Sequence, residues 1–180
     1  MTTERPRPLI QGQLDGLCGV YSLVQALLHF RGTDNDNVRA RYFNGLIENL
    51  VSQDRFRSSK IRSGFNRKAL KSALAHVIQN DTKLDIEMVD LPEFARDRKI
   101  AKVLEAFDGL DFHESIILHL KDPAHWICAY RAKSGKIKCY DSSSDENDRL
   151  VNLTDGQLKS RDVSFASGLV ILRRTNAQTH

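Results

Sequence analysis

The chain has 180 residues, of which 41% are hydrophobic and 28% are charged. These proportions are typical of a soluble globular domain and exclude wholesale disorder and repetitive fibrous proteins. No apolar run approaches the ~20 residues of a membrane-crossing helix, and the N-terminus has no apolar core of signal-peptide length. We therefore expect one domain over residues 1–180 in the cytoplasm, although a specialised secretion system would leave no readable mark.

The net charge of +4 is unevenly distributed. Between Arg55 and Lys71 there are seven basic residues and no acidic one. A solvated loop followed by one helix face explains most such segments. Binding of an acidic partner at this basic segment remains an alternative, and nucleic acid is a less expected partner. The seven residues are Arg55, Arg57, Lys60, Arg62, Arg67, Lys68 and Lys71.

The first half of the chain has the periodicity of helices. Apolar residues recur at helical spacing over 18–30, and Gly32 is a typical stop for this helix. Residues 37–51 predict a second helix, and residues 67–79 predict a third that Asn66 can cap. A fourth amphipathic helix is expected over 98–107.

The second half has the pattern of strands. Residues 84–89 alternate between apolar and polar side chains, and residues 115–120 form a short apolar run. Strands over 126–131 and 136–141 flank the hairpin signal at 133–135, and a last strand is expected over 168–174. Helices followed by antiparallel strands predict an α+β fold, with N-terminal helices packed on a C-terminal antiparallel sheet.

Cys18 is the candidate nucleophile. It lies at the predicted start of the first helix and has a glycine on either side, at Gly16 and Gly19. The partial positive charge of a helix N-terminus favours a thiolate, which is the reactive form of cysteine. A buried cysteine that acts as a small hydrophobic residue is the alternative explanation.

His125 is the candidate base among six histidines. It opens a predicted strand and would therefore lie at an edge that a substrate can reach, whereas His29 is ~16 Å along the same helix from Cys18. Asp141 closes the hairpin partner of that strand. An aspartate in this place can accept the imidazole N–H and stabilise the imidazolium, although a strand-ending turn would also explain it.

The hairpin also constrains the other two cysteines. If His125 directly faces Asp141, then Cys128 opposes Lys138 and Cys139 opposes Ile127. Neighbouring positions point to opposite faces, so Cys128 and Cys139 are expected on different faces and reduced. The odd cysteine count and the absence of a CxxC pair also argue against a disulfide framework or a zinc site.

The order of the motifs Gln13-Leu-Asp-Gly-Leu-Cys18-Gly19, His125-Trp126 and Asp141 resembles the papain-like cysteine peptidases. Within them it looks most like the bacterial double-glycine leader peptidases that process bacteriocins. The resemblance implies a papain-like fold and an oxyanion-hole glutamine six residues before the cysteine. That position holds Gly12, so Gln13 is the expected donor and Gln11 is the reserve.

The sequence therefore predicts a thiol hydrolase that cleaves a peptide or isopeptide bond without a cofactor or metal. Cys18 would attack, His125 would move the proton, Asp141 would orient His125, and Gln13 would bind the oxyanion. Trp126 would shield the His125–Asp141 pair from water. An acyltransferase or transglutaminase with the same residues, or a binding module with a basic surface, remains an alternative.

Overall fold

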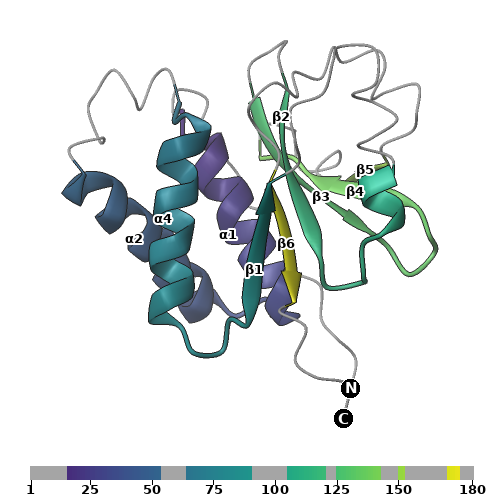
Figure 1. The fold of residues 1–180 in the computed structure, drawn as a ribbon, viewed down its shortest axis with the longest axis horizontal. Coiled ribbons are helices and arrows are strands. Elements are labelled where there is room, and N and C mark those ends of the chain that lie inside the picture. The colour runs from purple at the N-terminus through teal and green to yellow at the C-terminus, as the bar shows by residue number, and fades with distance from the viewer. Residues whose placement is uncertain are drawn as a thin grey trace.

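In the described part of the chain, the computed structural model shows N-terminal helices packed on one antiparallel sheet, which confirms the predicted α+β fold (Figure 1). The first helix lies against the sheet, and two further helices pack on the first. The helices are α1 (Cys18–Arg31), α2 (Asp36–Ser52) and α4 (Arg67–Asn80). The structure describes residues 16–53, 64–90, 105–120, 125–142, 150–152 and 170–174.

The ends of the helices follow from local sequence. Gly32 ends α1 in the left-handed conformation at φ 60°, and its N–H donates to the carbonyl of His29. The Asn35 side chain accepts from two backbone N–H groups at the start of α2. Asn66 does the same for the N–H of Ala69 in α4, as predicted.

The sheet has six strands in the order β1-β6-β2-β3-β4-β5, and every neighbouring pair is antiparallel. Strands β3 and β4 form the predicted hairpin, with Gly135 at φ 78° in its turn. The strand bounds are β1 (Ile86–Asp90), β2 (Ser115–Leu120), β3 (His125–Arg131), β4 (Ile137–Tyr140), β5 (Leu150–Asn152) and β6 (Val170–Arg174).

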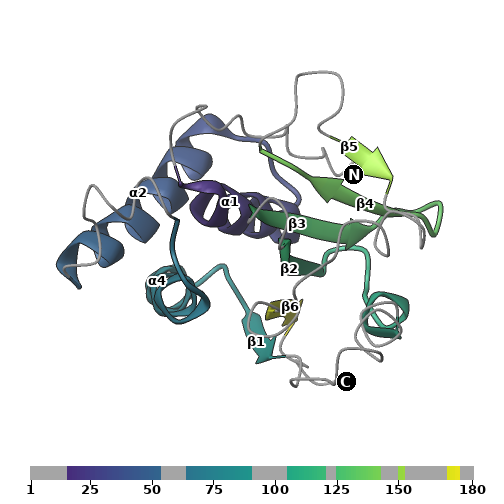
Figure 2. The same ribbon diagram turned by 90° about the horizontal axis from the view of Figure 1, so that it is seen from above.

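Helix α1 is the centre of the core. It lies between the sheet and the other two helices, against β2 and β3 on one side and against α2 and α4 on the other (Figure 2). Twelve of its fourteen residues are buried, which explains why its sequence is apolar on more than one face. The position of its first residue, Cys18, is therefore fixed by packing on both sides.

A buried carboxylate ties the ends of the helices together. Asp81 accepts hydrogen bonds from Tyr42 Oη at 2.9 Å and from Arg41 at 2.6 Å, and Arg31 lies 3.5 Å away. Burial by itself would raise the pKa of Asp81, but the hydrogen bonds from Lys83 N and Tyr42 and the two arginine charges outweigh it, so the pKa lies below its usual value. This cluster joins α1, α2 and the end of α4.

The predicted hairpin register was wrong by two residues. Cys128 pairs with Tyr140 rather than Lys138, and Cys139 pairs with Ala129 rather than Ile127. The assumption that His125 and Asp141 face each other directly caused the error. Because the shift is even, the two cysteines still lie on opposite faces of the sheet, as predicted.

Two other expectations differ in extent. Of the helix expected over 98–107, only the last three residues lie in the described part of the chain, where 105–108 form a helical turn. Strand β5 was not predicted, because its three residues, Leu-Val-Asn, carry too short a pattern for the alternation rule.

Candidate active site

The N-terminus of α1 places the sulfur of Cys18 beside the sheet. Cys18 is the first residue of the helix, and no side chain of the described residues caps it. The first turn also contains no acidic residue. Among the described residues of this turn, no carboxylate therefore neutralises the N–H groups and the positive end of the helix dipole, which favours negative charge at this point.

His125 and Asp141 are joined by a short hydrogen bond. The Nε2–H of His125 donates to Oδ1 of Asp141 over 2.7 Å. The two residues are 7% and 5% exposed, so water competes little for this bond. With Nε2 engaged by the carboxylate, Nδ1 is the ring nitrogen left for Cys18.

The register of the hairpin explains how His125 and Asp141 meet. Tyr140, the last residue of β4, pairs with Cys128, so one further step of the ladder sets Asp141 opposite Ile127. His125 lies two residues before Ile127, on the same face, which makes it the diagonal neighbour of Asp141. Diagonal neighbours lie within reach of long side chains, and the imidazole spans the gap.

The electrostatics of His125 link all three residues. Burial lowers the pKa of the imidazole, but hydrogen bonds to Asp141 and to Cys18, and the charges of both groups, raise it to about 9. His125 is therefore an imidazolium at neutral pH. A cation held between a carboxylate and a sulfur stabilises a thiolate and can supply a proton to a leaving group.

The structure thus brings together three of the four predicted site residues: Cys18, His125 and Asp141. Gln13 and Gln11 lie outside the described residues, and so does the basic segment from Arg55 to Arg62. The remaining basic residues, Arg67, Lys68 and Lys71, lie in α4.

Trp126 and His119 lie at the same end of the neighbouring strands β2 and β3. The two residues pair across β2 and β3, and their ring centroids are 4.5 Å apart. Trp126 belongs to the core that also contains Cys18. Its ring packs against His119, whereas we expected it to cover the His125–Asp141 pair.

His119 was not singled out from the sequence, where it lies within the apolar run over 115–120. The ring is partly exposed, and its pKa is lowered, first by burial and then by the charge of His125. Its position in β2 could have indicated this, because pairing of β2 with β3 sets His119 opposite Trp126, the residue after the predicted base His125.

The other two thiols differ from Cys18. Cys128 and Cys139 are both 0% exposed, and their thiols are reduced. Burial raises the pKa of Cys128 far above its usual value, which makes its thiol unreactive. Among the described residues, no group of three or more His, Cys, Asp or Glu side chains could hold a metal ion.

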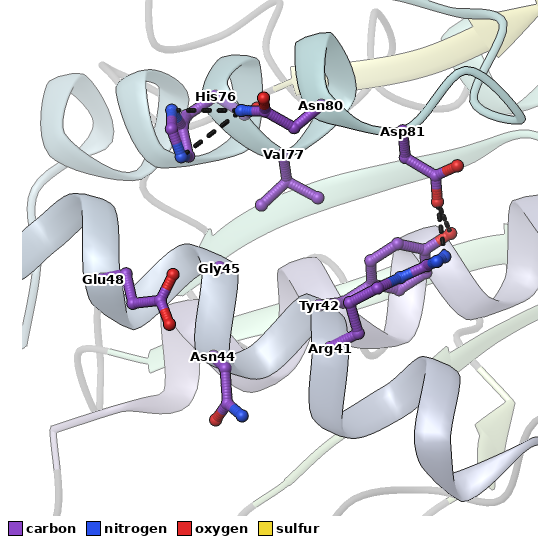
Figure 3. A pocket seen from close by; sticks show the side chains of 9 residues that line it. All are labelled: Arg41, Tyr42, Asn44, Gly45, Glu48, His76, Val77, Asn80 and Asp81. Atoms are coloured by element: carbon purple, nitrogen blue, oxygen red, sulfur yellow. Dashed lines mark hydrogen bonds and ion pairs between the residues drawn. The ribbon is translucent and has the colours of Figure 1, made fainter.

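A separate hollow of about 450 Å³ lies between α2 and α4 (Figure 3). Its lining includes Glu48 and His76 but no cysteine, and the charged groups at one end are the Arg41–Asp81 pair already described. It therefore offers no thiol nucleophile.

In the described part of the chain, no helix is both long and apolar enough to cross a membrane. Comparisons of the sequence with protein-family models and with curated proteins find no match. Among solved structures, the chain is similar to the avirulence protein AvrPphB of Pseudomonas, with 10% identity and a TM-score of 0.42. The similarity covers 88% of this chain and 91% of that one.

Proposed function

We propose that this protein is a papain-like cysteine peptidase, a thiol hydrolase that cleaves a peptide or isopeptide bond. The observation that carries the proposal is the convergence of three side chains from distant elements: Cys18 from the start of α1, His125 from the start of β3, and Asp141 from the end of β4. A structural role would not require an imidazolium between a thiol and a carboxylate.

In the proposed reaction, the Cys18 thiolate attacks the carbonyl carbon of the substrate. The tetrahedral oxyanion is bound by the backbone N–H of Cys18 and the side chain of Gln13. His125 then gives its proton to the leaving amine as the C–N bond breaks, which leaves a thioester on Cys18. In the second half, His125 takes a proton from water, and the resulting hydroxide attacks the acyl carbon and displaces the sulfur of Cys18. The carboxylic acid product leaves, and the Cys18 thiolate and the His125 imidazolium are restored.

Asp141 acts on His125 rather than on the substrate. Its carboxylate fixes the ring so that Nδ1 faces the sulfur, and it stabilises the positive charge that the ring carries before it donates its proton. The double-glycine leader peptidases resembled by the sequence motifs suggest one substrate class, a peptide cut after two glycines.

A peptide-library cleavage profile tests the proposal, with double-glycine peptides included in the library. We expect the wild type to give defined cleavage products and Cys18→Ala to give none. Cys139→Ala is the matched control, because it removes a buried thiol that lies outside the site. Cleavage that persists in Cys18→Ala would refute the proposal.

The same experiment distinguishes hydrolysis from acyl transfer. With a competing amine present, a hydrolase gives free carboxylic acid, whereas an acyltransferase gives an amide that mass spectrometry separates by its added mass. Products that carry the amine in preference to water would replace the proposed hydrolase with the transferase.

A further inference from the structure

Helix α1 presents a stripe of four polar side chains to the sheet. They are spaced three or four residues apart, so they lie along one side of the helix, and each is at most 6% exposed. Ser22 and His29 have a hydrogen bond to a residue of the sheet or of the loop before it, and Cys18 interacts with His125 of the sheet. The four are Cys18, Ser22, Gln25 and His29.

Gln25 is the exception in this stripe. It is 1% exposed, and neither its Nε2 nor its Oε1 has a hydrogen-bond partner among the described residues. A buried amide that has lost its water is costly, so nearly all such groups bond to the protein or to an ordered internal water. The side chain of Gln25 therefore points to a ligand within the fold.

The space next to Gln25 is just large enough for one water molecule. A cavity of about 10 Å³ is lined by Gln25 and Ser22 from α1 and by Ser142 from the chain just after β4. This volume is close to the smallest that holds one water molecule. Ser142 is 6% exposed and directly follows Asp141, so one wall of the cavity is the residue next to the acidic residue of the candidate site.

We propose that Gln25 is a positioning residue: its amide binds one internal water in this cavity, and the water holds the chain at Ser142 and thereby the carboxylate of Asp141 against His125. The proposal rests on the function assigned to these residues above. The amide has a donor and an acceptor, as a bridging water requires.

The test is an NMR titration of histidine-labelled full-length protein, which reads the pKa of His125 without any turnover. Gln25→Met keeps the length of the side chain and removes both hydrogen-bonding groups. We expect it to lower the pKa of His125 from about 9 toward its usual value, because Asp141 is held less closely. We also expect magnetisation transfer from a long-lived water to the Gln25 amide protons in the wild type.

Gln53→Met is the matched control. Gln53 is a half-buried glutamine of the α2 C-terminus whose Nε2 bonds Asn49 and Ser72, both at 2.7 Å and outside the site. It should leave the pKa of His125 unchanged. If Gln25→Met does not fold, Ser142→Ala removes the opposite wall of the cavity and is expected to give the same lowering.

An unchanged pKa of His125 in Gln25→Met and in Ser142→Ala, with only the melting temperature reduced, would overturn the positioning role. The absence of magnetisation transfer from water to the Gln25 amide in the wild type would refute the presence of the internal water. A chain that shows both expected results yet cleaves no peptide would refute the proposed function and leave this inference intact.

Discussion

The hydroxyl of Ser22 donates a hydrogen bond to the backbone carbonyl of Trp126 over 2.9 Å. Ser22 lies one helical turn after Cys18, and Trp126 directly follows His125. This bond therefore links α1 directly to β3, one helical turn from the point where Cys18 lies beside His125. Sequence reasoning did not identify Ser22, because a serine in an apolar helix gives no sign of its partner.

Ser22→Ala is expected to lower both stability and activity. The buried carbonyl of Trp126 loses a donor, which costs about 1–3 kcal/mol in the free energy of unfolding. A shift of α1 by a fraction of an ångström should lower kcat by ~10-fold or more, since catalysis is sensitive to displacements of this size. Urea denaturation and peptidase kinetics measure the two effects.

Ser52→Ala is the control for Ser22→Ala, because Ser52 also donates to a backbone carbonyl, that of Asn49, but on the exposed end of α2. It should change neither quantity appreciably. Equal losses in the two variants would contradict the role assigned to the bond between α1 and β3.

Asp141→Asn is expected to move the alkaline limit of activity. The imidazolium of His125 donates the proton to the leaving group, and it loses its charge as the pH rises through about 9. Asparagine removes the negative charge that holds this pKa up, so the alkaline limb should move to lower pH and kcat should fall by ~10²-fold. The pH profile of kcat/KM measures this, and an alkaline limb that stays near pH 9 would contradict the assignment.

His119 is expected to report on the charge of His125. Burial is the larger cause of its lowered pKa, and the positive charge of His125 is the second. His125→Gln should therefore raise the pKa of His119 without restoring its usual value. Histidine NMR measures the shift, and an unchanged pKa of His119 would mean that the two rings do not interact.

Gly19→Ala is expected to destabilise the contact between α1 and α4. A Cβ atom on Gly19 would lie 2.6 Å from Cδ1 of Leu70, which is 3% exposed and has little room to move. Overpacking of this kind costs about 1–3 kcal/mol, which exceeds the gain of up to ~1 kcal/mol from the better helix propensity of alanine.

The Leu70→Ala background tests the origin of that cost. There the added methyl group enters space that Leu70 has vacated, so Gly19→Ala should be neutral or stabilising. Thermal denaturation of the two single variants and the double variant closes the cycle. The same cost in both backgrounds would show that the contact with Leu70 is not its cause.

The fold was predictable from the sequence where the pattern was long and local. Helix α1 has a continuous apolar stripe and a glycine stop, and α4 has Asn66 as its cap, so both were located within one or two residues. The hairpin was predictable because Gly135 marks its turn. These signals are short-range, and they also placed Cys18 and His125 at the start of their elements.

The exact pairing and the supporting contacts could not be derived in the same way. The hairpin register depends on the turn between Ala132 and Lys136, and the assumption of direct pairing between His125 and Asp141 missed the diagonal arrangement. The residues that Ser22 and Gln25 face, Trp126 and Ser142, lie more than one hundred residues further along the chain. Nothing near Ser22 or Gln25 in the sequence therefore indicates these partners.

The most direct test of the proposed site is the rate at which iodoacetamide alkylates each cysteine at pH 7, read by intact mass and peptide mapping. Cys18 is only 6% exposed, so rapid labelling would require both an accessible sulfur and an activated thiolate. We predict fast labelling of Cys18 alone, and its loss in His125→Ala while Cys128 and Cys139 stay unlabelled. Labelling of Cys18 no faster than in His125→Ala would contradict the assignment of Cys18 as an activated nucleophile.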